Sequence, residues 1–270
     1  MAEERNVKLG VVGFGVVGKA MAQCLSGSSA NTVVVYDKFQ KPFQERRRQE
    51  EINTCDLVFV CVPTPSRNDG TCDTSAVEEC IGWITPPICI KSTVIPGTVE
   101  RLSEGNRQVA FSPEYIGQEL DHPWKAICSC GFAIVGGPAQ VRVLVAKALR
   151  PCLPPQTIIC ETDSRTAELC KYMENCFLAT KVAFVNQFFE IANSFGINFG
   201  ELRQLWLCDP RVGSSHTLVT EERGFGGACL PKDLDALAAA MVPFGGAALL
   251  EAVAKYNRKI RKKRHLSNVR

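Results

Sequence analysis

The feature that most restricts the fold of this chain is a glycine-rich segment near its start. Residues 7–25 read VKLGVVGFGVVGKAMAQCL, an apolar strand-like run that leads through Gly13, Gly15 and Gly18 into helical apolar spacing. In a strand–turn–helix unit, the first glycine makes the tight turn, the second lets the backbone approach a pyrophosphate, and the third allows close helix-to-strand packing. The segment therefore predicts a dinucleotide-binding unit, with the phosphates at the helix N-terminus.

An acidic residue at the end of the next strand indicates which dinucleotide is bound. Residues 31–39 read NTVVVYDKF, which places Asp37 about twenty residues beyond the glycines. A carboxylate at this position binds the ribose hydroxyls of NAD and repels the 2′-phosphate of NADP. NAD is therefore the expected cofactor, while Lys38 keeps the choice of cofactor open. The alternative is a plain glycine turn in which Asp37 caps a helix.

Four further short apolar segments in the first half predict strands of the same sheet. They are DLVFVCVP (56–63), ICIKST (88–93), QVAFSPE (108–114) and FAIVGG (132–137). We expect an α/β fold with a Rossmann-like, doubly wound parallel sheet, in which ligands gather outside the carboxyl ends of the strands. The loops 62–65, 91–93 and 113–115 are therefore candidate site loops, although each alone could be an ordinary strand-to-helix turn.

The second half begins with one long predicted helix. Residues 163–197 keep helical apolar spacing without a proline, and Asp163 or Ser164 can cap the start. Lys171 and Asn175 share a face, and Asn186 lies three turns further along nearly the same stripe. They are surface residues, or a cation and donor that stabilise negative charge on a reacting oxygen. We expect an NAD-binding domain over 1–160 and an all-α central domain over 161–270, whose long helix packs between domains or subunits.

A second glycine-rich loop carries a cysteine. Residues 224–237 read GFGGACLPKDLDAL, and Pro231 starts a helix there. A thiol near a helix N-terminus and Lys232 would have a depressed pKa, which favours a nucleophile. The chain has fourteen cysteines, and most lie in apolar runs where a thiol is a small hydrophobe. The loop alone leaves both interpretations of Cys229 open.

Composition excludes several other classes of function. No C-x-x-C pair occurs and there are only three histidines, so we expect no metal site and no disulfide framework. No run of eighteen apolar residues predicts a membrane span, and the charged start MAEERNVKLG lacks a signal sequence, which predicts a cytoplasmic protein. The net charge of +3 includes two basic runs, 46–48 and 258–264, without a nucleic-acid motif. We interpret these runs as solvated faces; alternatively, the second docks on an unknown acidic partner or membrane surface.

Taken together, these segments resemble the UDP-glucose/GDP-mannose dehydrogenase family over residues 7–260. The motifs that carry the resemblance follow in order: GVVGFGVVGKAMA (10–22), VPTP (62–65) with DGTCDTS (69–75), KSTVIPGT (91–98), SPEYIGQE (112–119), AELCKYMENCFLATKVAFVNQ (167–187), DPRVG (209–213) and GFGGACLPKD (224–233). The last motif, after a Lys-x-x-x-Asn helix, is the most specific for this family.

The resemblance implies a two-step, NAD-dependent oxidation of a nucleotide-sugar C6 alcohol to a carboxylate, of the UDP-glucose to UDP-glucuronate type. It assigns the catalytic roles to Cys229 as nucleophile, Lys171 and Asn175 at the substrate oxygen, Asp233 and Thr93 at a water, and Glu114 as general base. Its cofactor-binding residues are Gly13, Gly15, Val16, Val17, Gly18, Asp37, Lys38, Pro63, Thr64, Thr93 and Lys232. Its substrate-binding residues are Glu114, Tyr115, Lys171, Asn175, Arg211, Phe225, Gly226 and Gly227.

The resemblance also implies a homodimer through the long helix, because Arg211 would reach the nucleotide sugar of a neighbouring subunit. Two departures lead us to expect weakened activity. Gln118 stands where the family often has a second glutamate, and the chain stops at Arg270, before a third, nucleotide-gripping domain. One alternative is a catalytically reduced relative that acts as a binding or scaffold subunit. Another is a 3-hydroxyacid dehydrogenase of the 6-phosphogluconate type, against which the Cys229 loop argues.

Overall fold

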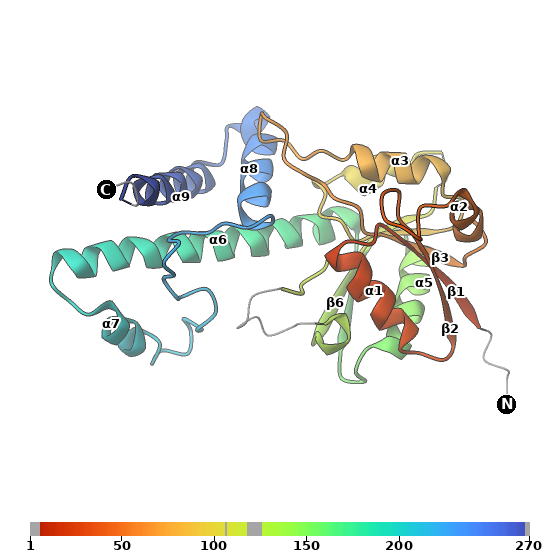
Figure 1. Cartoon of the computed structure of the whole chain (residues 1–270), viewed down its shortest axis with the longest axis horizontal. Helices are drawn as coiled ribbons and strands as arrows, with labels where there is room; N and C mark the ends of the chain where they lie inside the picture. Colours follow the sequence, from red (N-terminus) through yellow and green to blue (C-terminus); the bar gives the residue numbers. More distant parts are fainter. Residues whose placement is uncertain (1–5, 106, 118–125, 268–270) are drawn as a thin grey trace. The chain divides into compact units, whose positions relative to one another are not determined.

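The computed structural model describes residues 6–105, 107–117 and 126–267, and the chain forms two compact units (Figure 1). The first unit comprises Met1–Pro65 and Asp73–Lys171, and the second comprises Ser66–Cys72 and Tyr172–Arg270. The predicted division at residue 160 did not include this exchange: residues 66–72 belong to the second unit, whereas 161–171 belong to the first. No helix within the described ranges is both long and apolar enough to cross a membrane.

The first unit is built on one seven-stranded sheet in the order β2-β1-β3-β4-β5-β6-β7. Its strands are β1 (Val7–Val12), β2 (Asn31–Tyr36), β3 (Leu57–Val60), β4 (Ile88–Ile90), β5 (Val109–Phe111), β6 (Phe132–Gly136) and β7 (Ile158–Thr162). In sheet order, the first five strands, β2, β1, β3, β4 and β5, pair in parallel. β1, which leads into the turn before α1, pairs with both β2 and β3. The prediction of a Rossmann-like α/β sheet is confirmed.

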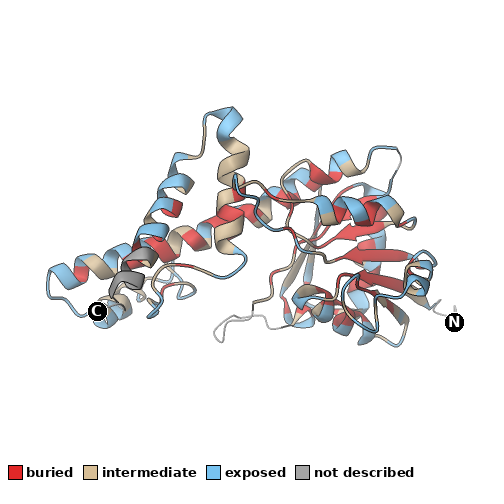
Figure 2. Ribbon diagram, turned by 45° about the horizontal axis from the view of Figure 1, so that its top comes forward, coloured by how far each residue is buried: buried red, intermediate tan, exposed pale blue. Residues whose placement is uncertain are grey.

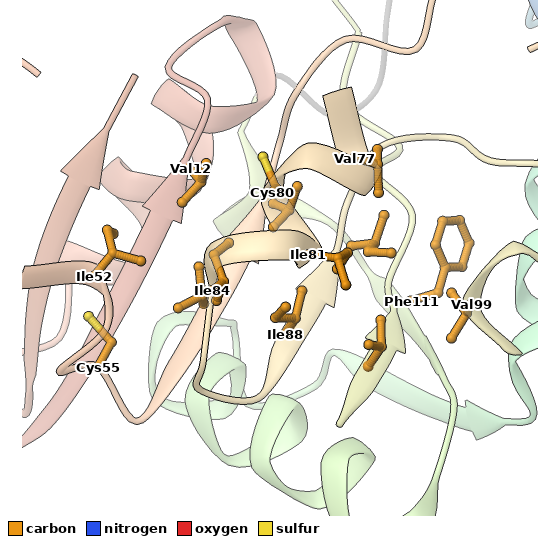
Figure 3. Close-up of a cluster of buried hydrophobic side chains, with 14 of the residues drawn as sticks. Val12, Ile52, Cys55, Val77, Cys80, Ile81, Ile84, Ile88, Val99 and Phe111 are labelled. Carbon is orange, nitrogen blue, oxygen red and sulfur yellow. The ribbon is translucent and has the colours of Figure 1, made fainter. Parts of the chain in front are cut away.

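Helices cover both faces of this sheet because its central strands are apolar on both sides (Figure 2). Helices α2 (Arg46–Ile52), α3 (Ser75–Trp83) and α4 (Thr98–Leu102) pack on one face around Phe111 and Ile88 (Figure 3). Helices α1 (Val16–Ser26) and α5 (Ala139–Leu149) pack on the other around Phe59 and Leu9. The short helical turns η1 (Ile127–Ser129) and η2 (Arg150–Cys152) lie in this unit as well.

The last two strands differ from the sequence-based expectation. β6 pairs with β5 in the antiparallel direction, so the sheet is not parallel throughout. Antiparallel neighbours need no crossover helix, and the described residues between β5 and β6 contain only η1. β7, which pairs in parallel with β6 across α5, was not predicted, because as an edge strand it is largely exposed and its apolar run, Ile158–Cys160, is short.

The second unit is helical. It contains most of α6 (Ser164–Ser194), with α7 (Phe199–Trp206), α8 (Leu230–Met241), the turn η3 (Val242–Phe244) and α9 (Ala248–Ser267). The predicted cap of α6 is confirmed, since the Thr166 amide donates to the Asp163 carboxylate at 2.9 Å. The core of the second unit joins α6, α8 and α9 around residues such as Phe225, Leu234 and Val253.

We predict that Phe111→Ala lowers the free energy of unfolding of the first unit by about 3–5 kcal/mol, because it empties a fully buried ring position between the sheet and α4. Phe39→Ala is the matched control, since its ring is 82% exposed and its removal should change stability by less than about 0.5 kcal/mol. Urea unfolding of the three proteins checks this. Equal effects of the two substitutions would contradict the assigned core.

Candidate active site

The glycine-rich turn between β1 and α1 forms the first part of the site. Gly13 has a φ of +89°, and a Cβ there would lie 2.8 Å from the carbonyl oxygen that follows β3. A Cβ on Gly18 would lie 1.8 Å from the Gly13 oxygen, so α1 approaches the turn too closely for a side chain. Gly15 caps α1, and Val16 and Val17 form its exposed or half-exposed first turn. This open helix N-terminus fits the pyrophosphate of a dinucleotide.

Asp37, directly after β2, binds this turn. Its carboxylate accepts the Phe14 amide at 2.7 Å and two amides of the following loop at 2.8 and 2.9 Å. The side chain is buried, so the acid is fixed beside the glycine turn, where a ribose would lie. Lys38 instead forms an exposed ion pair with Glu79 at 2.7 Å. The acidic group therefore faces the turn, while the neighbouring cation is held by another carboxylate.

The loops after β3 and β4 are joined to each other at the carboxyl edge of the sheet. Thr64 Oγ1 donates to the Thr93 carbonyl at 2.8 Å, and Ser92 Oγ donates to the Val62 carbonyl at 2.6 Å. Thr64 is buried, whereas Pro63 is exposed beside it. The structure thus brings three predicted cofactor residues, Pro63, Thr64 and Thr93, to one edge.

Glu114, the predicted base, is held by a buried lysine. Lys91 Nζ lies 3.2 Å from Glu114 Oε2, and less than a tenth of either side chain is exposed. Burial, the largest single influence, lowers the pKa of Lys91, but the charge and hydrogen bond of Glu114 together with the neighbouring Cys89 and Cys61 raise it, and the net pKa lies above its ordinary value. The pair is therefore a charged one in a site from which water is largely excluded. A lysine inside the apolar strand ICIKST was the available sequence signal for such a pair.

Lys171 and Tyr115 contact each other in the first unit. The Lys171 amine lies 4.3 Å from the centroid of the Tyr115 ring, within the range of a cation–π interaction. Tyr115 is buried and packs on Phe132 at 4.7 Å between ring centroids. The amine is thereby held against the residue that follows Glu114.

In the second unit, Asn175 and Asp233 form a buried hydrogen bond close to Cys229. Asn175 Nδ2 donates to Asp233 Oδ2 at 2.5 Å, and Lys232 forms an ion pair with the other oxygen of the same carboxylate. Cys229 is the residue that caps α8, and its carbonyl accepts the Asp233 amide at 2.9 Å. The thiol is exposed. Four residues that the resemblance assigns to the site, Cys229, Lys232, Asp233 and Asn175, are thus joined around the start of α8.

Two buried amides hold the loop that leads to Cys229. Asn186 Oδ1 accepts the Arg223 Nε at 2.8 Å and the Gly224 amide at 3.1 Å. Asn257, on α9, accepts the Phe225 amide at 2.8 Å and donates to the Phe225 carbonyl at 2.9 Å. Asn257 was missed by sequence analysis, because it precedes a basic run and nothing local indicates that it is buried. These two amides fix the predicted substrate loop from α6 and α9.

The remaining predicted substrate residues are placed as follows. Gly227 has a φ of +74°, and a Cβ on Gly226 would meet an arginine guanidinium of α9 at 2.9 Å. Arg211 is exposed and bonds Asp209 through its Nε at 3.0 Å. Lys181 donates to two carbonyls of the same loop at 2.9 and 2.8 Å, which holds the loop on α6.

Gln118 lies outside the described residues.

The cysteines separate into two kinds. All fourteen are free thiols, and those exposed are Cys128, Cys160, Cys208 and Cys229. Burial raises the pKa of Cys89 and of Cys130 to about 12, so these two thiols are neutral. In the described part of the chain no three His, Cys, Asp or Glu residues are arranged to hold a metal ion.

The basic run near the C-terminus is partly paired within the chain. Arg258 lies 3.2 Å from Asp235, and Arg261 lies 3.8 Å from Glu222. The side chains from residue 262 onward are outside the description. A partner for this run stays a prediction.

A Rossmann-like sheet with an open glycine turn and a buried acid after β2 defines the class of dinucleotide-binding oxidoreductases. The model for the UDP-glucose/GDP-mannose dehydrogenase family, NAD binding domain, matches residues 43–121, and the model for the central domain of the same family matches 165–259. The chain belongs to this family, and its cofactor is NAD.

Individual relatives agree with this family. A putative UDP-glucose 6-dehydrogenase of Bacillus subtilis is 28% identical over 86% of this chain and 62% of its own length. A UDP-glucose 6-dehydrogenase of Pseudomonas aeruginosa is 32% identical over 70% of this chain and 45% of its own. The chain therefore spans about half the length of such relatives. The solved UDP-glucose dehydrogenase of Pyrobaculum islandicum has the same fold, with a TM-score of 0.82 at 23% identity over 96% of this chain and 69% of its own.

We predict that Asp37→Ala weakens NAD binding about ten- to a hundredfold, because it removes a charged acceptor for the ribose and loosens the glycine turn. Asp37→Asn, which keeps one acceptor oxygen for the turn, should lose less. Arg47→Ala is the matched control, since its ion pair with Glu51 on α2 is exposed, and it should change the dissociation constant less than about twofold. Calorimetric titration with NAD measures all three. An unchanged affinity in Asp37→Ala would mean that the ribose lies elsewhere.

Proposed function

We propose that the chain oxidises the C6 alcohol of a nucleotide sugar to the carboxylate, of the UDP-glucose to UDP-glucuronate type, with Cys229 as nucleophile. The observation that carries this proposal is the placement of an exposed thiol at the N-terminus of α8, beside the buried Asn175–Asp233 hydrogen bond. A helix N-terminus stabilises negative charge that develops on a nearby atom. Most other cysteines of the chain are buried or half-buried and have no comparable surroundings.

The first oxidation removes a hydride from C6 and a proton from its hydroxyl, and leaves an aldehyde. NAD supplies the hydride acceptor when it is bound, and the glycine turn, Asp37 and the loop of Thr93 are the residues that would hold it. Lys171 and Asn175 would hold the substrate oxygen and its developing charge. Glu114 would take the proton as general base, and its ion pair with Lys91 keeps the carboxylate oriented.

The second oxidation uses the thiol. The Cys229 sulfur adds to the aldehyde carbon, and the carbonyl oxygen takes up a proton, which gives a thiohemiacetal. Loss of a second hydride and of the hydroxyl proton gives a thioester. Asp233 and Thr93 would then position a water that attacks the thioester carbon, releasing the carboxylate and the free thiol. One alcohol thus consumes two hydride acceptors and one water.

The glycine-rich loop would contribute to binding of the nucleotide sugar. Phe225, Gly226 and Gly227 lie in the segment that Asn186 and Asn257 fix, and the positive φ of Gly227 leaves its backbone amide without a side chain over it. Arg211 would serve a neighbouring subunit from its exposed position. Both roles are assigned from the family motifs at these positions.

A homodimer through α6 is part of the same proposal. Large apolar side chains follow one stripe of this helix at spacings of four and seven residues, with exposed fractions of 73% for Met173, 62% for Phe177, 48% for Phe184 and 41% for Phe188. Phe184 and Phe188 also contact each other, with ring centroids 4.7 Å apart. A contiguous apolar stripe of this kind is typical of a protein–protein interface.

We predict that the wild-type chain forms NADH with one or more members of a panel of UDP- and GDP-sugars, and that Cys229→Ser lowers this turnover at least about a hundredfold. Serine cannot form the thioester on which the second oxidation depends. Cys208→Ser, at another exposed cysteine of the second unit, is the matched control and should keep full activity. Absorbance at the NADH band measures the rate.

Two outcomes would contradict the proposed reaction. If the wild-type chain binds NAD in calorimetry but forms no NADH with any sugar nucleotide, a binding or scaffold subunit becomes the better assignment. Turnover of 3-hydroxyacids that Cys229→Ser leaves unchanged would instead favour a dehydrogenase of the 6-phosphogluconate type.

We predict that Phe177→Glu combined with Phe184→Glu shifts the chain from dimer to monomer in sedimentation velocity, because two charges would be buried in the apolar interface. Phe244→Glu is the control, since this side chain is 79% exposed and lies in η3 rather than α6. A wild-type chain that sediments as a monomer at micromolar concentration would contradict the dimer.

A further inference from the structure

Glu168 is a fully buried carboxylate, located one turn before Lys171 in α6, that the proposed reaction does not use. Its Oε2 accepts the Gly97 amide at 2.6 Å, and its Oε1 accepts the Val99 amide at 2.8 Å. These amides lie at the start of α4, where a helix has no backbone acceptors of its own for its first amides. One side chain of α6 thus satisfies two backbone donors of the segment that follows β4.

The bonded segment continues from the cofactor loop. At its start, Thr93 is held by Thr64 through the 2.8 Å hydrogen bond. Pro96 and Gly97 then occupy the centre of a tight turn closed by the Thr98 amide on the Ile95 carbonyl at 3.0 Å, and the φ of +94° at Gly97 is the value a type II turn needs. The segment is therefore fixed by Thr64 at one end and by Glu168 at the other.

Packing in the core leaves the backbone between these two ends little room to move. Val94 and Val99 are both at most 1% exposed and belong to the same apolar cluster as Phe111 and Ala167, the residue before Glu168. Figure 3 shows Val99 beside Phe111 in this cluster. Without Glu168, two buried amides would lose their acceptor while the valines stayed in the core. The loop could then satisfy the amides only by moving the turn at Gly97 toward water, which would pull on Thr93.

Keeping a carboxylate at this place has an energetic cost. Burial raises the pKa of Glu168 to about 7, with a smaller contribution from Glu100, while the two amide hydrogen bonds and Arg165 act in the opposite direction. Glu100 and Arg165 also pair with each other, with 2.5 Å between Arg165 Nη2 and Glu100 Oε2. An apolar residue would avoid the cost of burial but could not bind the two amides.

We propose that Glu168 is a positioning residue for NAD: it holds the Thr93 loop in its binding conformation from the helix that carries Lys171. The carboxylate does not contact the cofactor. It acts through the backbone of Gly97 and Val99, so that the cofactor loop and the first turns of α6 move as one element. The inference depends on NAD binding by the chain and is independent of the proposed oxidation of a nucleotide sugar.

The test compares Glu168→Ala and Glu168→Gln with Glu100→Gln, an exposed neighbour on α4. We expect Glu168→Ala to raise the dissociation constant for NAD about tenfold and to speed amide exchange at Gly97 and Val99 more than in β3. Glu168→Gln keeps one acceptor oxygen, so its dissociation constant for NAD and its exchange rates should lie between those of Glu168→Ala and the wild type. Glu100→Gln should bind NAD as the wild type does. Calorimetry and hydrogen exchange read by mass spectrometry give the two quantities.

The dependence on pH separates positioning from a purely structural role. Below a pH of about 7 the Glu168 carboxyl takes up its proton and accepts amide hydrogen bonds more weakly, so NAD affinity of the wild type should fall there relative to that of Glu168→Gln. A folded Glu168→Gln or Glu168→Ala whose affinity stays within twofold of the wild type would overturn the proposal, as would faster exchange at Gly97 and Val99 without loss of affinity. If Glu168→Ala does not fold, the NAD affinity of Glu168→Gln tests the proposal. Absence of NADH formation with sugars would leave the inference intact, because it is measured on binding.

Discussion

The close approach of α1 to the turn that precedes it is the constraint on which the rest of the first unit depends. A side chain at Gly18 would overlap the backbone oxygen of Gly13, and one at Gly13 would overlap the backbone after β3. Because both positions are glycines without side chains, the N-terminus of α1 can lie at the carboxyl edge of β1 and β3, where the loops of Thr64 and Thr93 are joined. Asp37 then ties the turn to β2. The parallel pairing of β1 to β4 places their loops at a single edge of the sheet, and the bare glycines let α1 begin there.

Buried polar side chains hold the loops of the second unit, whose described residues form no sheet. Asn186 and Asn257 replace the backbone partners that the residues around Phe225 would have in a strand. An amide can donate and accept at once, so Asn257 satisfies both backbone groups of Phe225 without a buried charge. The fully buried carboxylate of Asp233, near Cys229, is paired with an amide and a lysine. The loop is thus held by groups whose burial costs little once they are paired.

How far the sequence could predict this arrangement depends on whether the cause is local. The glycine turn and Asp37 are recognisable because a turn, a strand end and their spacing lie within about thirty residues. The antiparallel pairing of β6 depends on the neighbour it meets across the sheet, and the exposed edge strand β7 has only a short apolar run, Ile158–Cys160. The exchange of residues 66–72 into the second unit and the burial of Asn257 depend on contacts far apart in the chain. Helical spacing grouped Lys171, Asn175 and Asn186 on one stripe but did not indicate their partners.

Those partners show that one helix serves several functions in succession. Along α6, Glu168 binds the segment after β4, Lys171 lies over the Tyr115 ring, Asn175 bonds Asp233 and Asn186 holds the loop before Phe225. The first two partners belong to the first unit and the last two to the second. The apolar stripe of Met173, Phe177 and their neighbours uses the positions that these polar residues leave open, so the proposed association through α6 would use other positions of the same helix.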